Sequence, residues 1–323
     1  ALFLDDGSTQ VLVVASDLLG LRAPQVARVR ELVTEATGVP AGHVFLACSH
    51  THGGPLMYSD FAGFSAAHEA YLETLYHYIA GAAQQAANAA IPVCYGHARK
   101  EVRLGANRRE RQADGTTKIG VDLDAPVAPW TDVICFDRAD GSGTLAMLYQ
   151  HAVHGTCMQG DNYLFTADTM GYAMRLVEAQ LESSTALFLN GCAGNINPHP
   201  RGTFGLARRH GTRLGAAVLQ AVTEIADFRE EGRLNCIQHE CELPLEEPRP
   251  LEECERDLTE IEPAYLALGG AHHKSWTLSR RYFAAKAQVE AARSGQLASG
   301  LPIEIQVVAL DDLALVSLPG EIF

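Results

Sequence analysis

The sequence predicts an α/β protein in which mixed β-sheets are layered and flanked by helices. Apolar strand-like runs alternate with helical patterns in the first third, and hairpin patterns occupy the middle and the end of the chain. Strand–helix alternation favours parallel pairing, whereas hairpins pair antiparallel. The sheets are therefore expected to be mixed, and a strict parallel barrel is disfavoured.

The first elements can be assigned from apolar periodicity. An apolar run over residues 10–15 predicts a buried strand, and the helical pattern of residues 24–37 ends at Gly38. Glycine is the usual residue just beyond a helix, where the backbone turns left-handed. A second apolar strand, residues 44–48, leads directly to His50.

The next elements begin at a capping residue, a proline or a turn. They are a helix capped by Ser65, a strand from Pro92, a hairpin of residues 132–136 and 144–153, helices near 168–181 and 205–225, and the strand 186–189 between those helices.

One domain over residues 1–323 is the simplest organisation for this pattern. Within it, residues 240–262 are acidic and contain prolines, which indicates an exposed connector that leads into a helical pattern ending near residue 294. The last hairpin, residues 303–310 and 313–318, delivers the turn that precedes Glu321.

Charge and hydropathy limit the partners. The chain has 39 acidic and 25 basic residues, a net charge of −14, which works against nucleic acid and anionic membranes as partners. No apolar run reaches the ~18 residues of a transmembrane segment. The eight cysteines are scattered without a Cys-x-x-Cys pair, so a reducing, cytoplasmic location is expected. An upstream leader and a homo-oligomeric state are both left open.

The sharpest chemical signal is His50-Thr51-His52, at the end of an apolar strand and before Gly53-Gly54-Pro55. On an extended chain, residues two apart face the same side, so both imidazoles could share a metal. A capping His beside an exposed one is an equally ordinary explanation of His-x-His. The bare glycine turn, which lets a substrate approach, favours a site.

Two further histidines and one acid lie at strand ends. His151 and His154 are three residues apart, so at most one is expected to join the site, and His154 is the one nearer the strand end. His151 is expected in the core, and Glu321 is a candidate carboxylate ligand. The other histidines show no metal spacing; they include His68, His77, His272 and His273.

Three motifs in order resemble the catalytic domain of the neutral, non-lysosomal ceramidases. They are Ser49–Pro55, His154–Met158 followed by Thr166–Ala173, and Cys192–Pro198, and Pro319-Gly320-Glu321 completes the series. The motifs extend over nearly the whole chain. The resemblance implies a zinc hydrolase with the layered fold of that family, in a shorter and divergent form that lacks N- and C-terminal parts of the family domain.

Carried over residue by residue, the resemblance implies that Zn²⁺ is bound by His50, His154 and Glu321. The family's fourth ligand, a Tyr, would lie beyond residue 323, and whether one or two metals bind is left open. His52 would be the acid–base partner. Arg108, which follows an Asn as in the family, would contact the substrate carbonyl, although the adjacent Arg109 could compete with it.

The expected reaction is cleavage of an N-acyl amide, small or lipid-like, by a metal-activated water. His52 would take the proton and pass it to the leaving amine. Arg108 and the main-chain amides near Gly194 and Asn195 would hold the oxyanion, and Asn197 would orient the carbonyl. The family has a Ser where Asn197 stands, so an acyl-enzyme is not expected at this position.

Two alternatives remain. His-x-His also occurs on the first strand of amidohydrolase barrels, which would imply hydrolysis of a cyclic amide or lactone. A catalytically degenerate binding protein with the same fold is the non-enzymatic alternative. Metallo-β-lactamase-like hydrolases are excluded, because Gly53-Gly54 stands where they require Asp-His.

Overall fold

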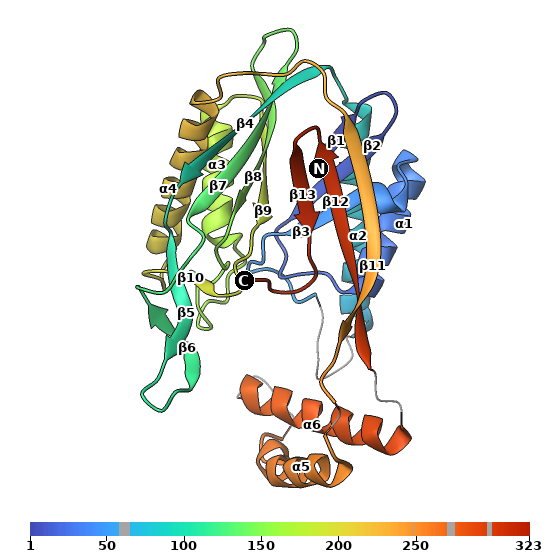
Figure 1. Cartoon of the computed structure of the whole chain (residues 1–323), viewed down its shortest axis with the longest axis vertical. Coiled ribbons are helices and arrows are strands. Elements are labelled where there is room, and N and C mark those ends of the chain that lie inside the picture. The colour runs from blue at the N-terminus through green and yellow to red at the C-terminus, as the bar shows by residue number, and fades with distance from the viewer. Residues whose placement is uncertain (58–64, 248, 270–274, 296–298) are drawn as a thin grey trace. The chain divides into compact units, whose positions relative to one another are not determined.

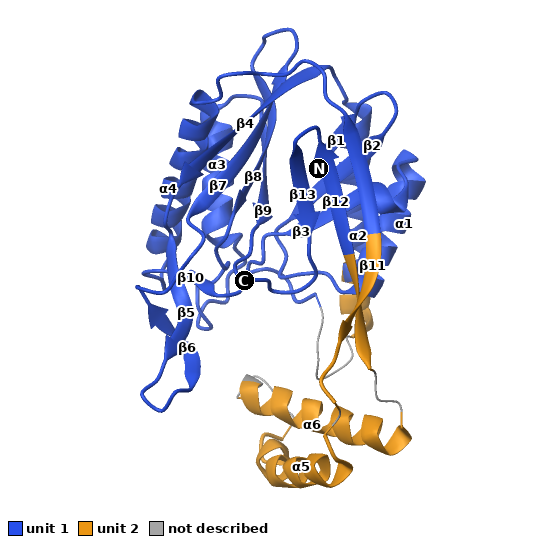
Figure 2. Ribbon diagram, in the orientation of Figure 1, with its two compact units in different colours: residues 1–57, 72–238, 305–323 blue, residues 58–71, 239–304 orange. Residues whose placement is uncertain are grey.

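The computed structural model describes residues 1–57, 65–247, 249–269, 275–295 and 299–323. The chain forms two compact units (Figure 2). Unit 1 contains residues 1–57, 72–238 and 305–323, and unit 2 contains residues 58–71 and 239–304. The single domain over residues 1–323 stays a prediction, and every candidate site residue belongs to unit 1.

The first sheet of unit 1 has the order β1-β2-β3. Strands β1 (Leu2–Asp5) and β2 (Gln10–Ser16) pair antiparallel, and β2 pairs parallel with β3 (Val44–Cys48). Helix α1 (Ala23–Thr37) makes the crossover between the parallel strands and ends at Gly38, whose φ is 78°. Helix α2 (Ala66–Asn88) follows β3, and Ser65 accepts a hydrogen bond from the third residue after it, as a cap does.

The second sheet has the order β4-β7-β8-β9. Its strands are β4 (Val93–Glu101), β7 (Trp130–Arg138), β8 (Thr144–His151) and β9 (Thr185–Asn190). The first three pair antiparallel, whereas β8 and β9 pair parallel, with helix α3 (Asp168–Gln180) between them. Helix α4 (Phe204–Thr223) follows β9. The predicted mixed sheets are confirmed.

Unit 1 is layered. Val11 and Val13 of β2 share a buried cluster with Ile134 and Phe136 of β7, so the two sheets pack against each other through apolar faces. The opposite face of the second sheet packs on α3 and α4 through residues such as Met147. Figure 1 shows α1 and α2 beside the first sheet and α3 and α4 outside the second. This layered α/β architecture is the fold class that the sequence predicts.

Two smaller sheets complete the chain. One, β10-β5-β6, consists of β5 (Gly105–Arg111), β6 (Thr117–Asp122) and β10 (Ile196–Pro198). The other, β11-β12-β13, consists of β11 (Leu234–Pro244), β12 (Gly300–Leu310) and β13 (Leu313–Ser317). Strands β12 and β13 form the predicted terminal hairpin.

Residues 240–262, the predicted acidic connector, include regular structure. They contain the end of β11 and most of helix α5 (Leu251–Leu266), which packs against helix α6 (Trp276–Ser294) in unit 2. Most side chains of β11 are exposed, so its sequence lacks the apolar alternation of a half-buried strand. Acidic residues in the first turn of α5 are favoured there by the helix dipole.

His272 and His273 lie outside the described residues. Among the helices within those residues, none has both the length and the apolar character that crossing a bilayer requires.

The contact between α3 and α4 gives a test of the packing. A Cβ on Gly211 of α4 would lie 2.4 Å from Tyr172 Cβ and 2.6 Å from Thr169 O. Because a main-chain atom cannot move aside without shifting a helix, Gly211→Ala should lower the stability of unit 1 by about 1–3 kcal/mol. Urea denaturation followed by circular dichroism measures the loss.

Gly81→Ala is the matched control, since nothing lies within 4 Å of a Cβ at this position in α2. Relief from the entropy cost of a helical glycine should leave it as stable as the wild type or up to about 1 kcal/mol more stable. Equal destabilisation by both variants would contradict the packing described here.

Candidate metal centre

The loops after β3 and β8 lie side by side and carry three histidines. Thr51 and Gly155 form a parallel bridge, and the His52 main-chain N–H donates to the Gly155 carbonyl over 2.9 Å. A Cβ on Gly155 would lie 2.5 Å from Thr51 Cα, so the loops approach too closely for any other residue. This contact brings His154 beside His50 and His52, which lie about a hundred positions earlier in the sequence.

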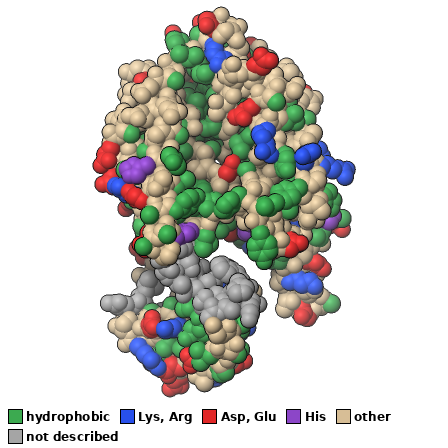
Figure 3. All heavy atoms as spheres, turned by 180° about the vertical axis from the view of Figure 1, so that it is seen from behind, with side chains coloured by type: hydrophobic (Ala, Val, Ile, Leu, Met, Phe, Trp, Pro, Cys, Tyr) green, Lys and Arg blue, Asp and Glu red, His purple; other side chains and the backbone are tan. Residues whose placement is uncertain are grey.

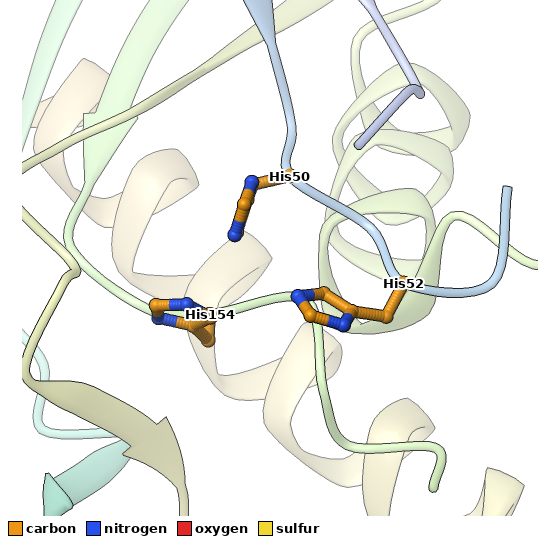
Figure 4. A group of neighbouring side chains, drawn as sticks. All are labelled: His50, His52 and His154. Atoms are coloured by element: carbon orange, nitrogen blue, oxygen red, sulfur yellow. The ribbon is translucent and has the colours of Figure 1, made fainter. Parts of the chain in front are cut away.

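The three imidazoles converge. One possible ligand atom from each of His50, His52 and His154 lies within 4.8 Å of the other two. The ring centroids of His50 and His154 are 4.8 Å apart, and those of His50 and His52 are 5.0 Å apart. Figure 4 shows the three rings pointing toward one another from two separate loops. The sequence-based expectation that His154 lies beside the His-x-His motif agrees with this geometry.

The backbone at the motif differs from the expected extended chain. His50 has a φ of 58°, in the left-handed region that non-glycine residues rarely occupy. His50 and His52 therefore do not share a side because of strand alternation, as the sequence analysis assumed. The turn at His50 brings them together instead. Such a conformation persists only where the surroundings enforce it, and here the Thr51–Gly155 bridge follows directly.

Main-chain carbonyls orient two of the rings. His50 Nδ1 donates to Leu19 O and His154 Nδ1 donates to Ala193 O, each over 2.7 Å. A carbonyl can only accept, so the proton is on Nδ1 and the lone pair of a neutral ring is on Nε2. His50 Nε2 is buried and has no hydrogen-bond partner among the described residues. Histidine ligands of metals are held in this way by their second nitrogen.

The Glu321 carboxylate faces both Nε2 atoms. Oε1 lies 3.5 Å from His50 Nε2, and Oε2 lies 3.1 Å from His154 Nε2. Two acceptors this close are favourable only with a proton or a cation between them. Ligand atoms bound tetrahedrally to zinc at about 2.0–2.2 Å are about 3.3–3.5 Å apart. The three residues therefore offer donor atoms that a metal ion could bind.

The protonation states suit a metal site. His52 is exposed at the surface of the cluster, and loss of solvation, followed by the nearby His50 and His154, lowers its pKa to about 4. Loss of solvation and the Arg108 charge also lower the pKa of His154. Partial burial opposes ionisation of Glu321, yet its electrostatic interactions with the neighbouring histidines and its hydrogen bond from Arg108 hold its pKa below the ordinary value. Neutral imidazoles and an ionised carboxylate are the forms that bind metal.

The two adjacent arginines of β5 have different contacts. Arg108 Nη2 lies 2.9 Å from Glu321 Oε2, and Arg108 Nε donates to Gly194 O over 2.8 Å. Arg109 instead places its guanidinium carbon 3.6 Å from the centre of the Phe323 ring. Arg108 is therefore the arginine at the histidine cluster. It lies within strand β5.

The glycine-rich turn is already engaged in main-chain contacts. The Gly194 N–H donates to Ile322 O over 2.8 Å, and Asn195 O accepts from the Arg108 N–H over 2.7 Å. The buried Asn197 accepts from the Thr156 hydroxyl through Oδ1 over 3.1 Å. The turn thus holds the segment of Glu321 and the strand of Arg108, and the proposed substrate contacts of Gly194, Asn195 and Asn197 stay predictions.

His151 lies apart from the cluster, as the spacing predicts. Its side chain is buried, and Nδ1 donates to Trp130 O over 3.0 Å. The sequence does not predict that Leu19, Ala193 and Gly155 hold the site through their carbonyl groups, because every residue type has a main-chain carbonyl. The glycine directly after His154 was the one available sign of a close approach.

No family model and no curated protein matches the chain. Among solved structures, the neutral ceramidase from Pseudomonas aeruginosa has a TM-score of 0.65 and 20% identity, covering 96% of this chain and 54% of that one. The chain has the neutral ceramidase fold. A ceramidase complexed with C2 matches with a TM-score of 0.60 and 21% identity, over 76% of this chain and 41% of that one. The chain thus spans about half the length of the ceramidases it matches, and the predicted resemblance is confirmed for the fold.

The ligand set within this ceramidase fold can be tested by metal content. We expect His154→Ala and His50→Asn to lose stoichiometric zinc, because each removes one Nε2 of the converging pair. Asparagine tolerates the left-handed backbone at position 50, so the loop should persist. Mass spectrometry of metals after zinc loading and desalting measures the stoichiometry.

His77→Ala is the control, since this side chain on α2 is 60% exposed and lies outside the cluster. It should retain the zinc content of the wild type. Full zinc retention in His154→Ala would contradict the assignment of this histidine cluster as the metal centre.

Proposed function

We propose that the chain is a zinc-dependent hydrolase that cleaves the amide bond of an N-acyl substrate. The observation that supports this most is the convergence of His50 Nε2 and His154 Nε2 on one carboxylate, Glu321. The fold of the chain is that of neutral ceramidases, whose name describes cleavage of an N-acyl amide. When bound, zinc would polarise the scissile carbonyl and activate a water molecule.

We assign the ligands as His50, His154 and Glu321, with His52 as the acid–base residue. The carboxylate of Glu321 lies within 3.5 Å of both Nε2 atoms, whereas the histidine triad as a whole spans up to 4.8 Å. His52 is neutral near pH 7 because its pKa is lowered to about 4. A neutral imidazole beside the site can accept a proton and return it to the leaving amine.

Charge that develops on the substrate oxygen needs a positive partner. Arg108 supplies a guanidinium that Gly194 O and Glu321 hold in place. A pre-oriented charge of this kind stabilises an oxyanion without further reorganisation. Since Asn197 Oδ1 is bonded to Thr156, its Nδ2 is the atom that we propose for the substrate carbonyl. The Gly194 N–H already bonds Ile322, so we propose the Asn195 amide as the main-chain donor.

Exposed apolar side chains favour a lipid-like substrate. Tyr163, Leu164 and Phe165 are 94%, 66% and 82% exposed and directly precede Thr166. The Thr166 N–H donates to Gly53 O over 3.0 Å, which ties this segment to the loop of His52. Figure 3 also shows apolar side chains gathered over the lower part of unit 1 on one face. Consecutive exposed apolar residues are uncommon without an apolar ligand or surface.

The amidohydrolase alternative loses its structural basis. It requires a closed barrel of parallel strands, whereas the described strands form separate sheets, and each of the four contains an antiparallel pair. A non-catalytic binding protein with the same metal site remains the competing hypothesis, and activity measurements decide it.

Zinc-loaded protein should hydrolyse N-acyl amides that carry a fluorogenic amine, with longer acyl chains cleaved faster. A chelator should abolish the activity, and added zinc should restore it. His52→Ala should keep its zinc and lower kcat by about 10²–10⁴-fold, since one proton-transfer group is lost.

His77→Ala again serves as the control and should retain full activity. Two results would contradict the proposed roles. Hydrolysis that persists in the presence of a chelator would show that the reaction needs no metal, and loss of zinc in His52→Ala would show that His52 is a ligand.

A further inference from the structure

The two adjacent arginines of β5 both reach the segment that carries Glu321. The register between β5 and β6 shifts between Asn107 and Arg109. In a regular strand, Arg108 and Arg109 would face opposite sides. Both nevertheless contact residues 321–323, Arg108 at Glu321 and Arg109 at Phe323. Two steps along β5, from Asn107 to Arg109, oppose three along β6, from Asp122 to Ile119, so the extra residue lies in β6 and the register shift does not by itself turn Arg109.

Asn107 holds the main chain of β5 at Arg109. It is 6% exposed and accepts the Arg109 main-chain N–H through Oδ1 over 2.9 Å. Its Nδ2 donates to Pro126 O over 3.0 Å. The buried side chain of Asn107 therefore fixes the main chain from which Arg109 projects.

The segment that carries Glu321 needs such support. The Glu321 side chain is 51% exposed, in contrast to His154 at 1%. Behind it, a Cβ on Gly194 would lie 2.5 Å from Glu321 O and 2.9 Å from Ile322 O, so the segment rests directly on that glycine. The Gly194–Ile322 hydrogen bond holds it from one side, and the Arg109–Phe323 stack holds its end.

We propose that Arg109 is a positioning residue for the metal ligand Glu321, acting through a cation–π contact with Phe323. The inference rests on the proposed zinc site and adds a residue that touches neither metal nor substrate. A planar guanidinium stacks on an aromatic face, which a lysine does less well. Loss of the stack frees Phe323, and Glu321 then samples orientations away from His50 and His154.

The test is the zinc dissociation constant, measured by competition with a chromophoric chelator. Arg109→Gln and Phe323→Leu should each weaken zinc binding by about two- to fivefold, the effect of one exposed cation–π contact. The double variant should be no weaker than Phe323→Leu, because both changes remove the same interaction. Phe323→Tyr keeps the aromatic face and should match the wild type.

Arg111→Gln is the matched control. Arg111 is a second exposed arginine of β5, two residues further along the strand, and its loss should leave zinc binding unchanged. Thermal midpoints of all variants should stay close to that of the wild type, since Arg109 is on the surface. Selective weakening therefore reports positioning and not folding.

A second readout uses metal-free protein. Hydrogen–deuterium exchange of a peptide covering Gly194 should be faster in Arg109→Gln than in Arg111→Gln, because the amide bonds Ile322 in the supported segment. Equal zinc affinity and equal exchange in these two variants would overturn the inference while the proposed function stands. A wild type that binds no zinc would overturn both.

Discussion

The orientation of His50 and His154 by main-chain carbonyls is the interaction on which the proposed chemistry depends. Leu19 O and Ala193 O fix the Nδ1 protons, which turns both Nε2 lone pairs toward Glu321. Without these bonds the rings could rotate and expose the wrong nitrogen. A half-exposed carboxylate then suffices as the third partner, since the ion pair with Arg108 favours its ionised form although partial burial opposes it.

The fold supplies these carbonyls and ring positions from distant parts of the sequence. Two sheets pack through apolar faces, so that the loops after β3, β8, β9 and β13 all contribute to the site. Glycines then permit main-chain contact where the loops meet, at Gly155 against Thr51 and at Gly194 against Glu321. Apolar packing thus brings the segments together, and hydrogen bonds between main chains set the final geometry.

Much of this could be predicted from sequence, for identifiable reasons. The strands of the two large sheets carry apolar runs, and histidines at their ends mark the site, so β2, β3, β8 and β9 and the pair His50 and His154 were expected. Strand β11 was missed because both of its faces are largely exposed. The left-handed backbone of His50 and the register shift between β5 and β6 were also missed, since both are imposed by tertiary contacts. The contacts of Arg108 and Arg109 could not be predicted for the same reason. A regular strand places neighbouring side chains on opposite sides, yet both arginines contact residues 321–323.

X-ray absorption spectroscopy at the zinc edge tests the central claim most directly, because it reports the atoms bound to the metal. We expect a first shell of nitrogen and oxygen at about 2.0–2.2 Å, with the outer-shell scattering of two imidazoles and no sulfur. In Glu321→Gln the imidazole scattering should persist while the carboxylate contribution is lost. A shell with sulfur from Cys48 or Cys157, or scattering from three imidazoles in the wild type, would contradict the account.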